Sequence, residues 1–270
     1  MKEITLSVII VNYNGLPFLK DCFDSIAKQL DGISHEIIVT DNNSADGSCD
    51  YIIQHFPDVI LIPSSENLGF GKGNNTAVQK ASGEYILLLN NDTILQSHLS
   101  PALHVLKANS NIGALGINMF NAKGEYLKAG GRFPSVLNLI RLKNITWLGP
   151  EFSTGVFSKN LYDIDWLTGS FLLMPKRVYE QVGGFDEDYF MYVEDVDLCK
   201  KTALAGYRRV FMPGLSYTHF VGYNAAKDFL IIKGLETYID KHAKGIDHFF
   251  MHCALRINKI VKKIKKKKQV

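Results

Sequence analysis

Two acidic segments, far apart in the sequence, carry the side chains best suited to chemistry. Asp92 closes an Asn-Asn-Asp segment that directly follows an apolar run at residues 85–89. Glu194 and Asp195 form the second segment. A carboxylate just past a buried strand lies where α/β sheets bind ligands, at the carboxyl end of the strands. Two such sites can divide the work, because one can hold a divalent metal and an anionic group while the other removes a proton.

Each segment also has a purely structural explanation. An Asn-Asp turn is common after a strand for local reasons, and acidic residues such as Glu194, Asp195 and Asp197 stabilise the first turn of a helix. Neighbouring like charges raise the pKa of a carboxylate and a helix N-terminus lowers it, so the sequence leaves the net shift open. His219, a further candidate for the site, also has a structural explanation, because it could be a partly buried structural histidine. The pairing of the two segments is what favours chemistry.

The elements that must position these side chains alternate between strand and helix patterns. Apolar runs rich in Val and Ile predict strands at residues 5–13, 36–40, 59–62 and 85–89, and helical spacing predicts helices at 17–30, 47–56 and 71–81. Such alternation indicates an α/β fold with a mostly parallel sheet flanked by helices. Further along, the patterns predict strands at 166–174 and 207–212 and a helix at 196–205, while residues 118–163 read as irregular loops and hairpins.

Length and composition fit one domain followed by a tail. The chain has 270 residues, 46% hydrophobic and 21% charged, a balance that excludes a disordered chain. It has no apolar run of about 18 residues, so we expect no transmembrane helix, and its start shows no signal-peptide pattern. Four scattered cysteines fit reduced thiols in a cytoplasmic protein. We therefore predict a catalytic domain over residues 1–225 and a helical tail over residues 226–270.

Charge divides the chain at the same place. Residues 226–270 carry 12 Lys and Arg against 4 Asp and Glu, whereas the remainder carries 18 against 23. The tail has an apolar stripe at helical spacing, formed by Ile246, Phe249, Phe250, Cys253, Ile257, Ile260, Val261 and Ile264. Lysines on its other side and at its end complete a basic amphipathic helix, which is typical of a peripheral anchor on an anionic membrane.

The tail has two alternative uses besides membrane binding. The helix could instead pack on the domain itself or on a partner protein. Nucleic acid is disfavoured, because the body of the chain is acidic and contains no recognition module. We therefore expect a cytoplasmic protein that associates peripherally with the inner face of the cell membrane through its tail.

Polar residues also follow the earlier strands. Asp41 ends a buried strand, where a carboxylate can accept hydrogen bonds from a base or a ribose. Asp46 fits a helix N-cap as well as it fits a ligand. The Gly-rich stretch at residues 65–75, which includes Asn67 and Gly69, opens a helix and could face an anion, although a flexible loop explains it equally simply. Because its glycines follow the third strand rather than the first, they count against a dinucleotide-binding oxidoreductase.

Five segments in a fixed order connect these residues to a known family. They are Val8–Asn14, Val39–Gly47, Asn67–Phe70, Leu89–Asp92 and Glu194–Leu198. The series resembles the motifs of the family 2 glycosyltransferases, which have a GT-A fold, and most closely those of the rhamnosyltransferase-like branch. The resemblance covers nearly all of residues 5–222, and its specificity comes from the order of the segments rather than from any one of them.

The resemblance implies roles for the residues around a nucleotide. It makes Asp41 the carboxylate that binds the nucleotide base, and Asp46 lies in the same motif. Asn12, in the first motif, joins the same substrate-binding set. Asn67 and Gly69 match the loop that runs along the nucleoside.

The resemblance also implies the metal site and the base. The segment Asn90-Asn91-Asp92 matches the DxD metal motif, with Asn in its first position. Asp92 would then ligate Mn²⁺ or Mg²⁺ together with the diphosphate, and His219 would complete the metal site. Asp195 matches the catalytic base, with Glu194 beside it in the substrate pocket.

An aromatic segment precedes the second acidic site. Trp166 has an apolar face that suits a sugar ring, and Gly169 would allow a close backbone approach. The resemblance places both in the pocket for the acceptor and the donor sugar, while a core tryptophan is the equally simple alternative.

Together these features predict an inverting, metal-dependent glycosyltransferase. The implied donor is a nucleotide-diphosphate sugar, with rhamnose as one candidate sugar, and the implied acceptor is a glycan or lipid-linked glycan in cell-surface polysaccharide synthesis. A sugar nucleotidyltransferase is one rival, although it would carry a Gly-rich loop directly after the first strand, where this chain has Asn12-Tyr13-Asn14-Gly15. The other rival is a non-catalytic, glycan-binding protein of the same fold.

Overall fold

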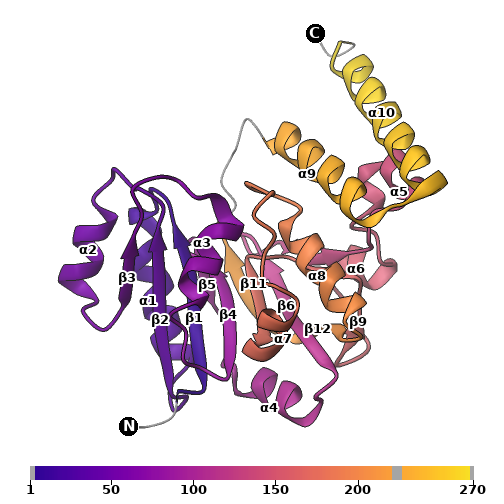
Figure 1. Ribbon diagram of the computed structural model, residues 1–270. Helices are drawn as coiled ribbons and strands as arrows, with labels where there is room; N and C mark the ends of the chain where they lie inside the picture. The colour runs from indigo at the N-terminus through magenta and orange to yellow at the C-terminus, as the bar shows by residue number, and fades with distance from the viewer. Residues whose placement is uncertain (1–3, 221–226, 268–270) are drawn as a thin grey trace.

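The computed structural model describes residues 4–220 and 227–267. A mixed β-sheet forms its centre, with the strand order β3-β2-β1-β4-β11-β6-β12-β5 (Figure 1). These strands are β3 (Ile60–Pro63), β2 (His35–Asp41), β1 (Leu6–Asn12), β4 (Tyr85–Asn90), β11 (Phe171–Pro175), β6 (Ile112–Phe120), β12 (Arg208–His219) and β5 (Thr93–Leu95). The strands from β3 to β4 are parallel, as is the pair β6 and β12, whereas β11 is antiparallel to both of its neighbours. The predicted α/β sheet is confirmed.

Helices flank the sheet, as the alternating pattern predicts. They are α1 (Leu16–Gln29), α2 (Ser48–His55), α3 (Gly69–Val78), α4 (Ser100–Ala108), α7 (Lys176–Gln181) and α8 (Glu194–Leu204). With helices on both faces, the middle strands are buried throughout, and β4 exposes little beyond its last residue, Asn90. Burial on both faces explains why these strands read as continuous apolar runs rather than as alternating ones.

The segment predicted as one strand at residues 166–174 forms two. β10 (Trp166–Leu167) pairs with β8 (Gly130–Gly131) in a small separate sheet, while β11 pairs with β4 in the main sheet. The chain therefore has to change sheets between them, at Thr168, Gly169 and Ser170. Local apolar character predicts the strand conformation but cannot show which partner each half takes.

The middle of the chain contains only short elements after β6, in agreement with its weak periodicity. These are β7 (Tyr126–Leu127), β8, α5 (Val136–Ile140), a 3₁₀ turn (Leu142–Asn144), α6 (Pro150–Thr154) and β9 (Tyr162–Asp163). Aromatic rings hold part of this region together, because Phe152 and Phe157 pack on each other and on Phe211 of β12. The region therefore packs against the sheet although little of it is regular.

Two helices, α9 (Lys227–His242) and α10 (Gly245–Lys267), form the C-terminal part (Figure 1). The predicted domain boundary at residue 225 falls outside the described residues. α9 packs on the body, where Leu235, Tyr238 and Ile239 are buried in a second hydrophobic cluster. Gly234 lies so close to the turn before α8 that an added Cβ would meet the carbonyl oxygen of Tyr192 at 2.6 Å. Much of α9 therefore belongs to the folded body.

α10 presents three different faces. Met251, Ala254 and Leu255 are buried, and the side chain of Asn258 donates a hydrogen bond to the carbonyl oxygen of Ile140 on α5. A second face carries Lys259, which pairs with Glu236 of α9.

The third face of α10 is apolar and exposed. It comprises Ile246, Phe249, Phe250, Ile257, Ile260 and Val261. Packing on the domain therefore accounts for one face of α10 and leaves these six residues of the predicted apolar stripe exposed to solvent. Of the other two, Cys253 is half-buried, and the side chain of Ile264 lies outside the described residues. In Figure 1 the far end of α10 extends away from the body. No helix among the described residues is long and apolar enough to cross a bilayer.

Candidate active site

A pocket of about 760 Å³ lies over the carboxyl ends of β1 and β4. Its volume is in the range of small-molecule sites, and its place is where open α/β sheets bind ligands. The pocket brings together residues from both acidic segments. Of the residues predicted from the sequence, Asn67, Gly69, Asn90, Asp92, Trp166, Gly169, Glu194, Asp195 and His219 line it.

The first acidic segment meets His219 at one side of the pocket. The Nε2 atom of His219 lies 3.1 Å from Oδ1 of Asp92 and 3.3 Å from the side-chain nitrogen of Asn90. This contact exists because β12 pairs with β5, which places Thr93 opposite His219. Residues that are distant in sequence thus form one compact group of potential metal ligands.

The donor atoms in this group suit a divalent cation. Oδ1 of Asn90 is buried without a hydrogen-bond partner among the residues that the structure describes. A buried carbonyl oxygen left in this state carries a desolvation penalty, which a bound cation would remove. Carboxylate and amide oxygens suit Mg²⁺ and Mn²⁺, and an imidazole nitrogen is a common additional ligand for a transition metal. Asn90, Asp92 and His219 therefore fit a metal site.

Asn12 and Asp41 lie beneath the pocket rather than on its surface. The side-chain amide of Asn12 donates to Oδ2 of Asp41 at 2.7 Å, and its carbonyl oxygen accepts from Asn91 at 2.7 Å. The other oxygen of Asp41 accepts from the backbone N–H of Ser44 at 2.8 Å. These bonds tie the ends of β1, β2 and β4 together. The predicted contact between Asp41 and a base stays a prediction, and binding there would have to compete with these bonds.

Asp46 has a structural role that its sequence position leaves open. Its Oδ2 accepts from the backbone N–H of Leu16 at the start of α1, and its Oδ1 accepts from the backbone and hydroxyl of Ser48 at the start of α2. Burial acts to raise the pKa of Asp46, but these hydrogen bonds outweigh it and hold the pKa below its usual value. Asp46 thus accepts from the first backbone N–H of both helices, and it is not among the residues that line the pocket.

Gly69 is required by a close backbone contact. Its φ angle is +78°, and an added Cβ would lie 2.4 Å from the carbonyl oxygen of Phe190. The next residue, Phe70, donates its backbone N–H to that oxygen at 3.0 Å. The side-chain oxygen of Asn67 accepts from the backbone N–H of Gly69, and Asn42 donates to the carbonyl oxygen of Gly69. These contacts hold the Gly-rich loop against the segment that leads to the second acidic site.

Asp195 is held in place by backbone groups. Its Oδ2 accepts from the N–H of Gly169 at 3.0 Å and its Oδ1 from the N–H of Val196 at 2.8 Å. The first contact depends on the change of sheets between β10 and β11, which exposes the N–H of Gly169. An added Cβ on Gly169 would meet the ring of Phe70 at 2.9 Å, so glycine also permits the close approach.

The environment of α8 changes the proton affinity of both acids. Burial raises the pKa of Asp195, and the two backbone hydrogen bonds counter only part of that rise. Burial and the neighbouring charge of Asp195 raise the pKa of Glu194 well above its usual value. Oε2 of Glu194 is buried with no hydrogen-bond partner in the described part of the chain. Of the two carboxyl groups, Glu194 is thus the one whose charged form is more strongly disfavoured.

The turn that leads into α8 is conformationally strained. Tyr192 and Val193 have φ angles of +69° and +76°, a region that residues with a Cβ rarely occupy. Gly234 of α9 packs directly against this turn. Such strain persists where surrounding structure enforces it, and it concentrates at functional sites. The packing of α9 therefore helps to set the position of Glu194 and Asp195.

Trp166 lines the same pocket. Its indole N–H donates to the carbonyl oxygen of Arg132 at 2.9 Å, which fixes the ring while leaving it partly exposed. Ile231 and Leu235 of α9 line the same pocket, together with Lys128. The sequence analysis did not assign these three residues to the site. The four-residue spacing of Ile231 and Leu235 is a signal for a buried helix face, but it does not show what that face covers.

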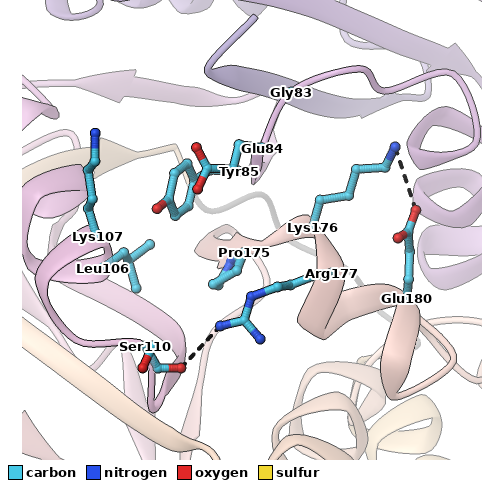
Figure 2. A pocket seen from close by; sticks show the side chains of 10 residues that line it. All are labelled: Gly83, Glu84, Tyr85, Leu106, Lys107, Ser110, Pro175, Lys176, Arg177 and Glu180. Carbon is cyan, nitrogen blue, oxygen red and sulfur yellow. Dashed lines mark hydrogen bonds and ion pairs between the residues drawn. The ribbon is translucent and has the colours of Figure 1, made fainter.

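A second pocket, of about 360 Å³, lies at the opposite end of β4 (Figure 2). Its basic side chains do not converge on a common point in Figure 2. Arg177 donates to the carbonyl oxygen of Ser110 and to the hydroxyl of Tyr207. Lys176 donates to the carbonyl oxygen of Ala81 and lies 3.5 Å from Glu180. Arg177 and Lys176 are therefore engaged with neighbouring protein groups rather than directed at a shared ligand position.

Comparison with known protein families shows which family the chain belongs to. The sequence model described as Glycosyl transferase family 2 matches residues 7–183, which is more than half of the chain. The chain belongs to glycosyltransferase family 2. The matched range includes Asp41, the Gly-rich loop and Asp92, and it ends before Asp195 and His219.

Curated relatives of this glycosyltransferase extend the match through the second acidic site. It is 29% identical over 265 residues to an N-acetylglucosaminyl-diphospho-decaprenol L-rhamnosyltransferase of Mycobacterium tuberculosis, covering 88% of this chain and 85% of the relative. It is also 29% identical to the rhamnosyltransferase WbbL of Escherichia coli, covering 79% and 82% of the two chains. The protein is therefore a rhamnosyltransferase-like family 2 glycosyltransferase, and the predicted enzyme class is confirmed.

Solved structures of glycosyltransferases share the fold. A mannosyltransferase from Pyrobaculum calidifontis, in complex with GDP-Man and Mn²⁺, has a TM-score of 0.62 at 21% identity and covers 93% of this chain and 69% of its own. GalNAc-T7 with UDP, GalNAc and Mn²⁺ has a TM-score of 0.66 at 16% identity and covers 89% and 49%. At these identities the likeness concerns the fold alone, and it confirms the predicted GT-A fold of this family 2 glycosyltransferase.

Proposed function

We propose that this glycosyltransferase moves a sugar from a nucleotide-diphosphate donor to a hydroxyl of a lipid-linked glycan, with a divalent metal and with inversion at the anomeric carbon. The observation that carries the proposal is that Asp92 and His219 share one pocket with Asp195. A cation site and a base on one cavity are what a single displacement at a sugar requires.

The donor would lie across the ends of β1 and β4. Asn67 and Gly69 line this side of the pocket, with the exposed ring of Tyr13 near them in the lining. Asp92, Asn90 and His219 would hold Mn²⁺ or Mg²⁺ together with the diphosphate. When bound, that cation supplies positive charge that stabilises the departing diphosphate. The solved mannosyltransferase and GalNAc-T7 complexes contain Mn²⁺, which supports a metal of this kind.

Asp195 would act as the base on the acceptor. Its carboxylate is oriented by the N–H groups of Gly169 and Val196, so its position does not depend on a flexible side-chain partner. A raised pKa makes Asp195 a better proton acceptor than an exposed aspartate, provided that the pH stays above that pKa. The acceptor oxygen, once deprotonated, would attack the face of the sugar opposite the leaving diphosphate, which inverts the configuration.

The acceptor side suits a sugar presented at a membrane. Trp166 offers an aromatic surface for a sugar ring, and the Mycobacterium tuberculosis relative is named for a diphospho-decaprenol acceptor. The exposed apolar face of α10 is followed in the sequence by a lysine-rich end, residues 262–268. Such a helix would lie at an anionic lipid surface and bring the catalytic pocket to a lipid-linked acceptor. We therefore place the enzyme at the inner face of the cell membrane.

A panel of nucleotide sugars with a lipid-linked N-acetylglucosamine acceptor tests the proposal. The panel should include dTDP-rhamnose, other dTDP and UDP sugars and GDP-mannose, each with and without Mn²⁺. We expect one donor to give a free nucleoside diphosphate and a new glycosidic bond, with the anomeric configuration inverted in the NMR spectrum of the product. Release of pyrophosphate would indicate nucleotidyl transfer instead. Retained configuration would contradict the role of Asp195 as base.

A further inference from the structure

Three potential metal ligands converge where α9 turns into α10. Asp240 lies in the last turn of α9, and His248 and His252 lie near the start of α10. The Nε2 atoms of His248 and His252 lie 2.9 and 2.8 Å from the same oxygen, Oδ1 of Asp240. One ligand atom from each residue falls within 4.8 Å of the other two.

The arrangement of these three side chains suits a metal ion. His248 and His252 are four positions apart, so they stand on one face of the helix, which is the spacing by which a helical His pair binds zinc. Both rings present the same nitrogen to the same point, and the third donor is a carboxylate from a different helix. Two imidazoles and a carboxylate form a three-ligand zinc set that leaves one position for water.

Access is consistent with binding. The side chain of Asp240 is 60% exposed, so solvent and a cation can reach the group. A cation bound between the three would take the place of the hydrogens that now lie between each Nε2 and Oδ1 of Asp240, and each neutral imidazole would then carry its hydrogen on Nδ1.

We propose that Asp240, His248 and His252 bind a zinc-class transition-metal ion that fastens α10 to α9. This site is separate from the group at Asp92 and His219, and it does not depend on the proposed function. Mg²⁺ should not replace zinc here, because Mg²⁺ prefers oxygen ligands and two of the three donors are imidazole nitrogens.

A metal ion at this site would connect the catalytic pocket, which α9 lines, to the exposed face of α10. The chain reverses between the helices through a short turn at residues 243–244 and Gly245, whose φ angle is +56°. α9 forms a wall of the catalytic pocket and presses on the strained turn before Glu194. A metal across the two helices would hold α10, and with it the exposed face that contains Phe249, in a fixed orientation to that wall.

The test must measure metal binding at Asp240, His248 and His252 without a contribution from the proposed catalytic metal site. Protein freed of metal with a chelator should carry Asp92→Asn and His219→Asn, which disable the first site. Titration with Zn²⁺ in a calorimeter should then show one equivalent per chain, and Co²⁺ should give the visible absorption of a tetrahedral complex. Adding His248→Asn and His252→Asn should abolish both signals. A single substitution of either histidine should weaken Zn²⁺ binding by at least about tenfold.

A matched control keeps the number of histidines equal. His55 and His104 are exposed and lie on α2 and α4, so His55→Asn with His104→Asn should leave the Zn²⁺ equivalent intact. Circular dichroism checks that every variant is folded. If the Asp92→Asn, His219→Asn protein does not fold, the same titration in the wild-type background should lose one of two equivalents on substitution of His248 and His252. Equal Zn²⁺ binding with and without those two histidines would overturn the proposal.

Discussion

Replacement of Asp195 by Asn is the sharpest test of the proposed base. The change keeps the shape of the side chain and removes its ability to take a proton. General bases contribute typically about 10² to 10⁴ in rate, so we expect kcat to fall by that factor, which corresponds to about 3 to 5 kcal/mol in the activation barrier. Donor binding should be retained, because the groups around Asp92 that we assign to the diphosphate are unchanged.

The effect on stability should be much smaller than the effect on rate. The carboxylate of Asp195 accepts from the N–H groups of Gly169 and Val196, one on each oxygen. An asparagine has one acceptor oxygen, so one N–H loses its partner, at a cost of about 1 to 3 kcal/mol. Removal of a buried charge offsets part of that cost, because burial is what raises the pKa of Asp195.

The assay compares rate, binding and melting in the same preparations. Asp188→Asn is the control, because Asp188 is 72% exposed in the segment just before α8 and its loss also removes one negative charge. The control should keep near wild-type turnover. The wild-type rate should fall as the pH drops through the raised pKa of Asp195, and Asp195→Asn should lack that pH dependence. Near wild-type turnover in folded Asp195→Asn protein would refute the assignment.

Three further predictions concern the metal group, the buried acid and the tail. Asp92→Ala should weaken nucleotide-sugar binding chiefly when Mn²⁺ is present; calorimetry with and without the cation measures this, and an equal loss in both conditions would make Asp92 structural. The pKa of Glu194 is raised in the folded state, so the folded protein is most stable when this side chain is protonated. The free energy of unfolding therefore falls as the pH rises through that raised pKa. The melting temperature of Glu194→Gln should therefore exceed that of wild type increasingly towards alkaline pH, whereas a constant difference would argue against the shift. The double substitution Phe249→Ser and Ile260→Ser should reduce sedimentation with anionic liposomes, because these side chains are 62% and 57% exposed on α10. The control Ile53→Ser changes a similarly exposed side chain on α2 and should not reduce sedimentation. Wild-type protein that ignores such liposomes at low salt would contradict a membrane role.

Substitutions at exposed positions test membrane binding more cleanly than deletion of the tail would. Removal of α10 would also remove Met251 and Leu255 from the second hydrophobic cluster and the hydrogen bond from Asn258 to α5. Loss of large buried side chains typically costs about 2 to 5 kcal/mol each. A deletion would therefore confuse loss of folding with loss of lipid binding, whereas exposed positions separate the two.

Much of the framework could be predicted from local patterns. Buried strands such as β1 and β4 are continuous apolar runs, and α1 has helical spacing, so their ends were placed within a residue or two. The polar residues that follow these strands point to the binding edge, because the carboxyl ends of parallel strands share one edge of a sheet. Motif order indicated the family, which the match over residues 7–183 confirms.

The family resemblance also assigned to the substrate some residues that the structure shows in other contacts. Asn12 and Asp46 are polar residues near strand ends, and sequence position cannot show whether such a side chain faces a ligand or its own backbone. In the structure Asn12 donates to Asp41 and accepts from Asn91, and Asp46 accepts from the first backbone N–H of α1 and of α2. Whether substrate also reaches them stays a prediction.

The sequence by itself determined the strands and helices, the family and the two acidic segments, because propensity, periodicity and motif order are properties of neighbouring residues. Only the tertiary structure decided which segments meet. His219 reaches Asp92 through the pairing of β12 with β5, and Asp195 reaches Gly169 because the chain changes sheets there. The faces of α10 were likewise decided by packing: a helix with a wide apolar surface can bury any part of it, and contact with α5 and α9 selects which part stays exposed.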